Sequence, residues 1–431
     1  MKKPFIIQRD RKNYFELPSG WELLCFADFN DQKAGQDVKD LARKSLNNPI
    51  QSPLIKNCLS PSDSIAVIIE DLTRASPKRL VLEVLLKELE SAHIARENIA
   101  IIIALGTHRE MSSKELAATF GQKLLEQYEF INHDCHAHDL VPAGRLFTGR
   151  TVKINRRVHE AAFKIGIGSI FPHPMNGFGG GSKIIFPGVA DFDSIVDHHL
   201  TFAFHEGTGL GKIEGNLFYD QVCSIAEAAG LNFIVNSVLD QKDQVFDIVS
   251  GNPVHAHIAG IEKSRKIITQ RFPKKSDLTI ITSFPYTEGP QIVKPLTPAS
   301  MVTKEGGCII LAADCTGGLP DAFVESFEKF HSEHGNDLLG SVLEHFEQNR
   351  LIMEGGAVDF NMALGFTLAI QGRFKIILVS ENIPRETGER MGFIYAGNLQ
   401  EAFELSAKIC PPNPEVHIIP SGGVILPVIS Q

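Results

Sequence analysis

Short runs rich in isoleucine and valine recur along this chain, and segments with helical periodicity separate them. Buried parallel strands have this composition. Four such runs occur before residue 240: Ile65–Ile69, Ile99–Leu105, Phe163–Ile170 and Phe233–Val238. Ser76-Pro77 predicts a helix start after the first run, and the capping box Ser112–Glu115 predicts another after the second. The alternation predicts βα units and a doubly wound sheet with right-handed crossovers.

A second set of strand-like runs follows the polar, proline-containing segment Arg271–Lys275. Its members are Leu278–Thr282, Cys308–Ala312 and Phe374–Ser380. A chain of 431 residues exceeds the size of one ordinary domain. We therefore predict an α/β protein with two domains, residues 1–274 and 275–410, each with a mainly parallel sheet flanked by helices. The active site is expected in the cleft between them, and the tail 411–431 is expected to form a hairpin or to return to the first domain.

Composition and charge narrow the class of protein. Hydrophobic residues make up 43% and charged residues 22%, which is typical of a globular protein, and the formal charge is 42 − 51, or −9. Basic residues form no stripe that could neutralise a nucleic acid backbone. No apolar segment is long enough for a signal sequence or a membrane span, and the seven scattered cysteines include no C-x-x-C pair. These features predict a cytoplasmic protein with reduced thiols that binds neither nucleic acid nor membranes.

The glycine-rich stretch between His173 and Lys183 carries the most information about function. Four glycines fall within five positions, and their backbone N–H groups could form an anion-binding nest. They are Gly177, Gly179, Gly180 and Gly181. A phosphate-binding loop of the Walker type is not indicated, because Ser182 precedes Lys183 and Ile184 follows it. A flexible turn is the alternative, but the flanking histidine and lysine favour a functional loop.

Polar residues also stand where the first two strands are expected to end. Asp71 and Arg74 follow the first strand, and Thr107 and His108 follow the second. Ligands of open α/β sheets bind at the carboxyl ends of strands, so both groups are expected to face one crevice. His108 could act there as a general acid or base. The alternative for Asp71 and Arg74 is a simple salt bridge within a loop.

Three further groups are candidates for ligand binding. His198 and His199 could bind a transition metal, although a surface histidine pair is an equal alternative. The cluster His133–Asp139 resembles a metal site but is better explained as an exposed polar loop. Gln291 and Lys294 lie three residues apart and could grip a carboxylate from one helical turn, with a solvated helix start as the alternative.

These motifs, in this order, resemble the lactate racemase family, whose members use a nickel-pincer nucleotide. The resemblance covers nearly the whole chain, and the stretch from His173 to His199 is its most specific part. The matching motifs are Asp71-x-x-Arg74, Gly106-Thr107-His108-Arg109, His173-Pro174, Gly177-Phe178-x-Gly180-Gly181-x-Lys183, Pro187-Gly188, His199 and Gln291-x-x-Lys294.

The resemblance implies a role for each matching residue. Lys183 would hold the cofactor, a pyridinium-3,5-bisthiocarboxylic acid mononucleotide with nickel, as a thioamide, and His199 would complete the nickel coordination. His108 and His173 would alternate as acid and base on opposite faces of the substrate. The resemblance also implies proteins that make the cofactor and load nickel as partners. The remaining expected roles are cofactor binding by Asp71, Thr107, Gly177, Gly179, Gly180 and Gly181, and substrate binding by Arg74, Gln291 and Lys294.

Hydride transfer makes chemical sense for inverting a 2-hydroxy acid. Forming a carbanion beside a carboxylate is costly, whereas hydride removal from C2 gives a planar 2-keto acid that can accept hydride on its other face. The implied activity is therefore a 2-hydroxy acid racemase or epimerase.

The sequence departs from the lactate-specific pattern at one wall of the expected pocket. Pro290 stands where lactate racemases tend to carry an aromatic residue, and Trp21 is the only tryptophan, so none lies in the second domain as predicted. Asp359 and Phe360 are expected near the corresponding wall. A malate-like, aromatic or sugar-derived 2-hydroxy acid is therefore as well indicated as lactate. A zinc hydrolase or lyase, and a hydroxy acid binding protein without activity, are alternatives, although a pure binder needs no pair of bases.

Overall fold

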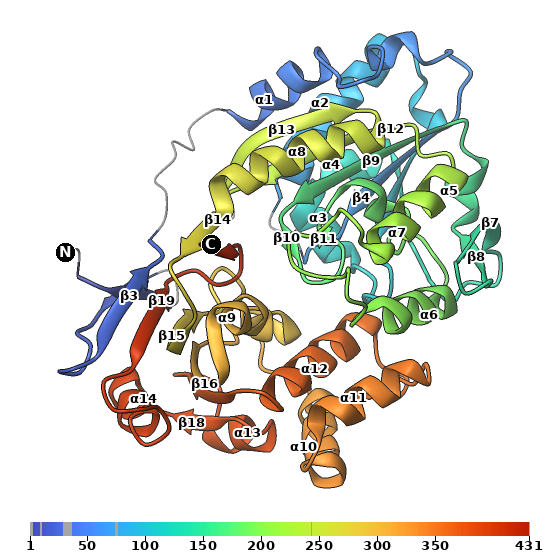
Figure 1. Cartoon of the computed structure of the whole chain (residues 1–431). Coiled ribbons are helices and arrows are strands. Elements are labelled where there is room, and N and C mark those ends of the chain that lie inside the picture. The colour runs from blue at the N-terminus through green and yellow to red at the C-terminus, as the bar shows by residue number, and fades with distance from the viewer. Residues whose placement is uncertain (1–2, 9–10, 29–36, 74–75, 243, 431) are drawn as a thin grey trace. The chain divides into compact units, whose positions relative to one another are not determined.

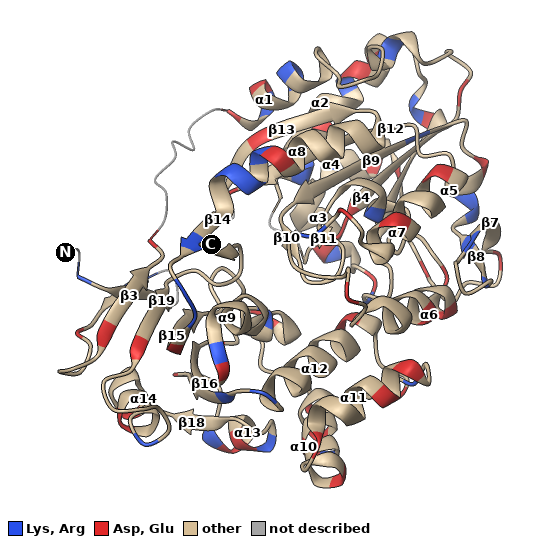
Figure 2. Ribbon diagram, in the orientation of Figure 1, with Lys and Arg blue, Asp and Glu red and all other residues tan. Residues whose placement is uncertain are grey.

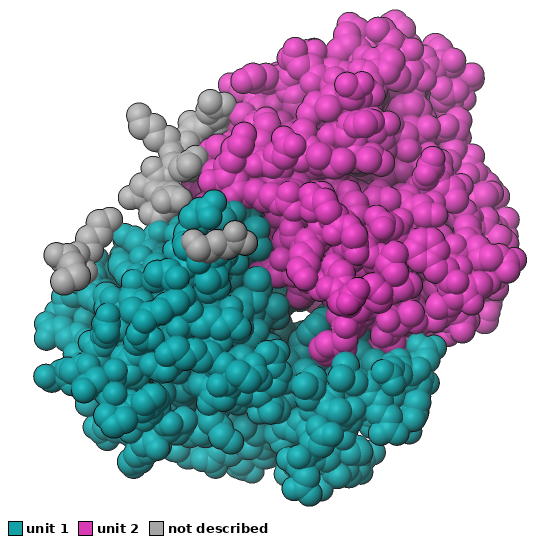
Figure 3. Space-filling view, viewed as in Figure 1, with its two compact units in different colours: residues 1–31, 268–431 teal, residues 32–267 magenta. Residues whose placement is uncertain are grey.

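A computed structural model describes residues 3–8, 11–28, 37–73, 76–242 and 244–430. The chain divides into two compact units, which Figure 3 shows in different colours. Unit 1 contains residues 1–31 and 268–431, and unit 2 contains residues 32–267. Arg74 lies outside the described residues.

Unit 2 is built on a six-stranded sheet. Adjacent strands run parallel, except that β13 pairs antiparallel with β12 at one edge. In spatial order the strands are β13 (Val245–Gly251), β12 (Phe233–Leu239), β9 (Phe163–Ile170), β4 (Ile65–Glu70), β5 (Ile99–Ala104) and β6 (Glu129–Asn132). After β4 the chain adds β5 and β6 on one side and then β9 and β12 on the other. The strand order therefore reverses between β4 and β9.

Helices and short hairpins complete unit 2 (Figure 1). Two antiparallel pairs, β7 with β8 and β10 with β11, lie outside the large sheet. The hairpin strands are β7 (Val141–Arg145), β8 (Thr151–Ile154), β10 (Pro172–His173) and β11 (Gly177–Phe178). The helices are α1 (Val38–Leu46), η1 (Ile55–Asn57), α2 (Lys78–Ser91), η2 (Arg96–Asn98), α3 (Ser113–Phe120), α4 (Gln122–Gln127), α5 (Arg156–Glu160), η3 (Gly181–Ile184), α6 (Phe192–Phe202), α7 (Leu217–Ala228) and α8 (Pro253–Ile268).

The two faces of β9 have different partners. Ile165 and Ile167 belong to a buried core with residues of α1, α2 and α3. The alternating residues Gly166 and Gly168 face the opposite side, because side chains alternate along a strand. A Cβ atom on Gly166 would lie 2.7 Å from Ile184, and one on Gly168 would lie 3.7 Å from the Cα of Gly180. The missing side chains thus let the glycine-rich loop lie directly on the sheet.

Unit 1 contains a second six-stranded sheet whose neighbouring strands are all parallel. Its order also reverses, here between β15 and β19. In spatial order the strands are β18 (Ile394–Ala396), β17 (Lys375–Val379), β16 (Thr303–Ala312), β15 (Ser276–Thr282), β19 (Glu415–Ile419) and β3 (Glu22–Phe26). The buried apolar residues of β15, β16, β17 and β19 form its core with Ala402 and Phe403 of α14.

The other elements of unit 1 surround this sheet. A hairpin pairs β1 with β2, and β14 pairs parallel with β20. These strands are β1 (Phe5–Gln8), β2 (Arg11–Tyr14), β14 (Thr269–Phe272) and β20 (Leu426–Ile429). The helices are η4 (Gly289–Val293), α9 (Leu296–Val302), α10 (Asp321–His334), α11 (Leu338–Glu347), α12 (Val358–Gln371), α13 (Arg385–Arg390) and α14 (Leu399–Ser406).

The predicted fold class is confirmed, since each unit has a mainly parallel sheet with helices. The units nevertheless differ from the predicted domains at both ends of the chain. Residues 1–31 belong with the C-terminal part, because β3 pairs with β19 in its sheet. The tail remains in this unit and forms no hairpin, since β19 joins the large sheet and β20 pairs with β14. Pairings between segments so distant in sequence leave no local signal.

Acidic and basic segments are interspersed along the helices of both units (Figure 2). Several ion pairs link neighbouring turns, as Arg79 and Glu83 do at 3.0 Å on α2. Such partly exposed pairs contribute little to stability. Among the described residues, no helix is long and apolar enough to cross a membrane.

Candidate active site

The strand reversal of unit 2 brings the predicted groups to one edge of the sheet. Asp71 directly follows β4, His108 lies four residues after β5, and His173 lies three residues after β9. Parallel neighbours end at the same edge, and ligands of such sheets bind where the strand order reverses. The groups after the first two strands were expected to face one crevice, and Asp71 and His108 from these groups are in direct contact.

Asp71 holds the ring of His108. The His108 Nδ1–H donates to Asp71 Oδ2 at 2.6 Å, and Asp71 Oδ1 accepts from the backbone N–H and hydroxyl of Thr73 at 3.1 and 2.6 Å. The Asp71 side chain is 6% exposed and that of His108 is 21% exposed. A proton on Nδ1 leaves the Nε2 lone pair of a neutral ring as an acceptor, which is the arrangement of a general base.

The ring of His173 contacts the side chain of Lys183. His173 Nδ1 accepts from the backbone N–H groups of Met175 and Asn176 at 3.2 and 3.1 Å, so the proton of a neutral ring lies on Nε2. Nε2 is 3.4 Å from the Lys183 Nζ. The two residues that flank the glycines in the sequence are therefore neighbours in space.

The glycines allow the loop to pack closely. Gly177, Gly180 and Gly181 have φ angles of +74°, +77° and +57°, a region that favours glycine. A Cβ on Gly177 would lie 2.1 Å from the Lys212 carbonyl, and one on Gly179 would lie 2.7 Å from the Phe171 ring. Two of the N–H groups are used internally, because Gly179 donates to the Phe171 carbonyl and Gly181 to Asn236. The loop is therefore a tightly packed support, and these two N–H groups are not directed at an anion.

Thr107 lies in the turn that carries His108. The preceding Gly106 donates its N–H to the Gly188 carbonyl at 2.9 Å, and His108 donates its N–H to Leu105 at 2.8 Å. The backbone of Gly188, just after the glycine-rich stretch, thus fixes the turn after β5. The predicted cofactor contact of Thr107 stays a prediction.

His199 is a buried imidazole whose ring is held in one neutral tautomer. It lies on α6, and its Nδ1–H donates to the Ile195 carbonyl at 2.9 Å, so Nε2 carries the lone pair. The pKa of His199 is lowered to about 3, mainly because the ring is buried, with a further contribution from the Lys183 charge. The ring also packs on Phe218 at 4.9 Å between centroids, and Lys183 Nζ lies 5.8 Å from the same Phe218 ring. His199 and Lys183 therefore share one aromatic neighbour.

The adjacent His198 is directed into the core. It is fully buried, its Nε2–H donates to the Phe218 carbonyl, and its ring contacts Phe186 and Phe202. The surface-pair alternative for His198 and His199 is therefore wrong. His133 is also buried and contacts the Ala190 carbonyl through Nε2, so only part of the 133–139 cluster is exposed as predicted. Within the described ranges, no group of three or more His, Cys, Asp or Glu side chains is arranged to hold a metal ion.

Gln291 and Lys294 lie in unit 1, at and just after η4. The Gln291 Oε1 is buried without a hydrogen-bond partner, and the Lys294 Nζ lies 5.4 Å from the centroid of the Tyr286 ring. Pro290 is buried in the same turn, and α12, whose first turn contains Asp359 and Phe360, packs against η4. The only tryptophan, Trp21, also belongs to unit 1, but it packs against Phe403 at 5.5 Å, in the core under α14.

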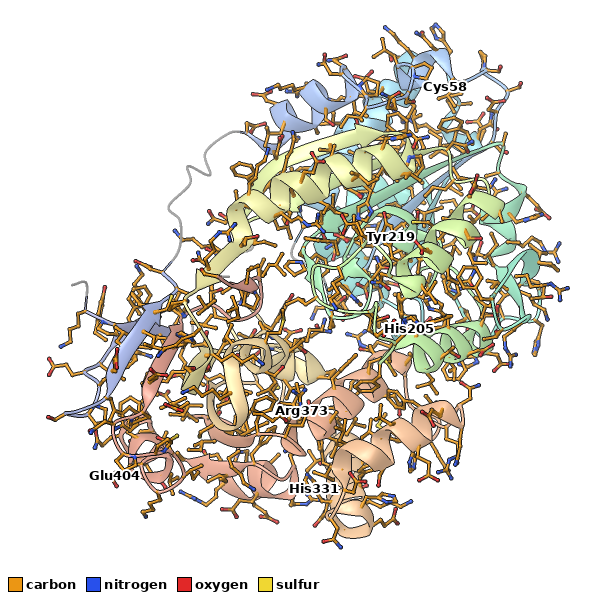
Figure 4. The ribbon with its side chains drawn as sticks, viewed as in Figure 1. Cys58, His205, Tyr219, His331, Arg373 and Glu404 are labelled. Atoms are coloured by element: carbon orange, nitrogen blue, oxygen red, sulfur yellow. The ribbon has the colours of Figure 1, made fainter. Side chains whose placement is uncertain are left out.

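Sequence reasoning missed the residues beneath the glycine-rich loop. Asn236 on β12, His257 on α8 and Tyr219 on α7, which Figure 4 labels, are all buried. Each lies within an ordinary strand or helix pattern and far from the loop in sequence. Only the buried polar type of Asn236 and His257 in apolar surroundings could have drawn attention to them.

Comparison with known proteins identifies the family. The model of the lactate racemase N-terminal domain matches residues 10–211, and that of the lactate racemase C-terminal domain matches residues 274–427. This chain belongs to the lactate racemase family. It is therefore an enzyme, an isomerase of the racemase type, and the predicted family is confirmed.

Relatives within the family align over most of their length. Lactate racemase of Thermoanaerobacterium thermosaccharolyticum is 28% identical over 396 residues, 90% of each chain. Lactate racemase of Lactiplantibacillus plantarum is 29% identical over 324 residues, 74% of each chain. A structure of the lactate racemase apoprotein from T. thermosaccharolyticum superposes with a TM-score of 0.86 at 27% identity and covers 100% of both chains. A protein from Thermotoga maritima, at 18% identity and a TM-score of 0.64, shares the fold.

Proposed function

We propose that this chain is a 2-hydroxy acid racemase or epimerase that works by reversible hydride transfer with a nickel-pincer nucleotide tethered to Lys183. The observation that carries the proposal is the grouping of the Asp71–His108 pair, the His173–Lys183 pair and His199 around the carboxyl edge of one sheet. Two histidines suit a reaction that moves a proton on either face of the substrate.

The residues present fit the cofactor. Lys183 offers a primary amine for a thioamide bond, and His199 offers a neutral imidazole Nε2, a donor that suits nickel. When bound, the nickel-pincer nucleotide would supply an acceptor for hydride. A single protein nitrogen would suffice for nickel, because the pincer supplies its own donors. A three-ligand zinc site, on which the alternative hydrolase depends, has no counterpart among the described side chains.

The protein's own groups would handle the proton and the carboxylate. His108 Nε2 would take the hydroxyl proton on one face, and Asp71, hydrogen-bonded to Nδ1, would stabilise the resulting imidazolium. His173 Nε2 would exchange a proton on the other face. Lys294 and Gln291 would bind the carboxylate, together with Arg74.

The substrate is a small 2-hydroxy acid, and lactate is the first to test because the relatives are named lactate racemases. Pro290 in η4, next to Gln291, is smaller than the aromatic residue that lactate racemases tend to carry there, which favours testing acids with larger side chains. Malate, an aromatic hydroxy acid and a sugar acid are therefore the next substrates. Cytoplasmic location and contacts with cofactor-synthesis and nickel-loading proteins follow from the same proposal.

The decisive experiment is intact mass and nickel analysis of protein co-expressed with a nickel-pincer biosynthesis system. Wild type is expected to carry the adduct and nickel, and Lys183→Ala to carry neither. Lys153→Ala, which changes an exposed lysine of the same unit, is the matched control and should load normally. Loaded protein is then tested for loss of optical purity of each acid by chiral chromatography. Absence of any adduct in wild type, while a known racemase loads in the same cells, would overturn the proposal.

A further inference from the structure

Buried polar side chains of two other elements, α8 and β12, form hydrogen bonds with the glycine-rich loop. His257 Nε2–H donates to the Gly179 carbonyl at 2.8 Å, and Asn236 Oδ1 accepts from the Gly181 N–H at 2.7 Å. Two peptide groups close to Lys183 in sequence are thereby fixed by side chains of other elements. His257 and Asn236 are 1% exposed, so water cannot replace these bonds.

The ring of His257 also fills the space next to the loop. A Cβ atom on Gly181 would lie 2.5 Å from His257 Cγ, which is closer than any stable contact. On the same helix, the guanidinium of Arg265 lies 5.5 Å from the centroid of Phe178 and donates to the Gly211 carbonyl at 2.9 Å. Helix α8 therefore contacts the loop both at its glycines and at its preceding hairpin.

The hydrogen bonds of His257 define one tautomer. Because Nε2–H donates to a carbonyl, Nδ1 of the neutral ring is an acceptor, and the Tyr219 hydroxyl lies 3.4 Å from it. Burial raises the pKa of Tyr219 well above its ordinary value, so its hydroxyl keeps the proton that it donates. The pKa of His257 is lowered to about 4, mainly by burial, so the ring is neutral near pH 7.

Helix α7 also packs against the short helix η3, which contains Lys183. Tyr219 and Cys223 lie one turn apart on α7, and burial raises the pKa of the Cys223 thiol. The helix that carries Tyr219 therefore lies next to the segment of the loop that contains Lys183.

We propose that His257 is a positioning residue that holds the glycine-rich loop through Gly179 and thereby presents the Lys183 amine for covalent attachment of the cofactor. The inference rests on the proposed function, because it concerns the same lysine. It gives helix α8, which contains none of the predicted site residues, a part in cofactor attachment. His257 does not touch the reacting atoms and acts through the loop.

Two substitutions separate the hydrogen bond from the packing. His257→Leu keeps apolar bulk but removes the donor, whereas His257→Gln places an amide N–H where Nε2–H was. His255→Leu makes the same change at an exposed position of α8 and is the matched control. Tyr219→Phe removes the hydroxyl at Nδ1 while the Nε2 donor remains.

The first readout is deuterium exchange in the protein without cofactor, followed in peptides that span residues 177–185. His257→Leu is expected to exchange about tenfold faster there, since the buried Gly179 carbonyl loses the His257 donor, and His257→Gln should return to within about threefold of wild type. The exchange rate of Tyr219→Phe should lie between those of His257→Leu and His257→Gln, and that of His255→Leu should match wild type. Wild-type exchange in His257→Leu would overturn the positioning role.

The second readout is the yield of Lys183 adduct after co-expression, measured by intact mass. An adduct in wild type that falls about tenfold in His257→Leu and recovers in His257→Gln would support both proposals. An undiminished yield in His257→Leu would overturn positioning alone. No adduct in wild type would overturn the tether, and the exchange measurement would still decide whether His257 fixes the loop. Melting temperatures within a few degrees of wild type would show that the variants fold.

Discussion

The two sheets of this protein have nearly the same plan but carry different groups at their strand reversals. In unit 2 the reversal lies between β4 and β9, and carboxylate, imidazole and amine side chains follow the strands of that region. In unit 1 it lies between β15 and β19, and the following segments hold an aromatic ring, a lysine and the Ser421-Gly422-Gly423 turn. On the proposed function, unit 2 would supply the groups for proton transfer and covalent attachment, and unit 1 would supply those that bind a carboxylate.

The sharpest test of this division is Lys183→Arg in unit 2. Arginine keeps the positive charge beside His173 but has no amine that could form a thioamide. Racemisation is expected to fall to background, with no adduct by intact mass. If the arginine variant kept substantial activity, Lys183 would serve only as a charge, and the covalent role assigned to unit 2 would be wrong.

The next largest effect is expected from His108→Gln. Removing a general base lowers kcat by about 10²- to 10⁴-fold, with a much smaller change in KM. The measurement is the initial rate of racemisation of each enantiomer by loaded enzyme. His138→Gln, at an exposed position of the same unit, is the control. A loss that appears in KM alone would place His108 in substrate binding and weaken the contrast between the units.

Lys294→Ala probes the contribution of unit 1. Loss of one charge-assisted hydrogen bond to the carboxylate should raise KM by about 10- to 100-fold and leave kcat within a few fold. Lys329→Ala, an exposed lysine of the same unit, should behave as wild type. A fall in kcat without a change in KM would mean that unit 1 takes part in the chemical step.

The smallest effect concerns stability and pH. The folded-state pKa values of His133 and His257 in unit 2 are lowered by burial, that of His257 to about 4. The unfolded chain therefore binds protons first as pH falls below about 6.5, and each such group reduces stability by about 1.4 kcal/mol per pH unit until its folded pKa is reached. His257→Gln removes one of these groups and should therefore lower the dependence of stability on pH by about 1.4 kcal/mol per pH unit.

Trp21 allows this effect to be assigned to a unit, because the only tryptophan lies in unit 1. Between pH 6.5 and 4.5, thermal unfolding followed by circular dichroism should lose more stability than unfolding followed by Trp21 fluorescence. His417 of unit 1 also has a pKa lowered by burial, so the fluorescence transition will shift as well, but less. Equal shifts in both signals, unchanged by His257→Gln, would contradict the assignment.

The sequence predicted the central strands well because their signals are local. The runs beginning at Ile65, Ile99 and Phe163 correspond to β4, β5 and β9, with ends that differ by at most one residue. β3 was missed because its neighbour β19 is almost four hundred residues away, and its four last residues are only partly buried.

The candidate site divides in the same way. Glycines, histidines and a lysine in close succession drew attention to the segment 173–199. The expected strand ends placed Asp71 and His108 at one edge of the sheet, but their direct contact was not predicted. His257 and Asn236 could not be found, because each is a single polar residue in an otherwise ordinary helix or strand. Their importance depends on contacts across 55 to 78 positions of sequence.

The placement of β3 also affects how the protein is made. During synthesis β3 leaves the ribosome early, but its sheet neighbour β19 begins only at Glu415. Unit 2, a continuous segment between residues 32 and 267, has all of its strands long before then. Because domains fold as units during translation, unit 2 with Lys183 can fold before β19, the last strand of the large sheet in unit 1, has been synthesised. On the proposed function, cofactor loading at Lys183 can therefore begin before unit 1, which would bind the substrate carboxylate, has folded.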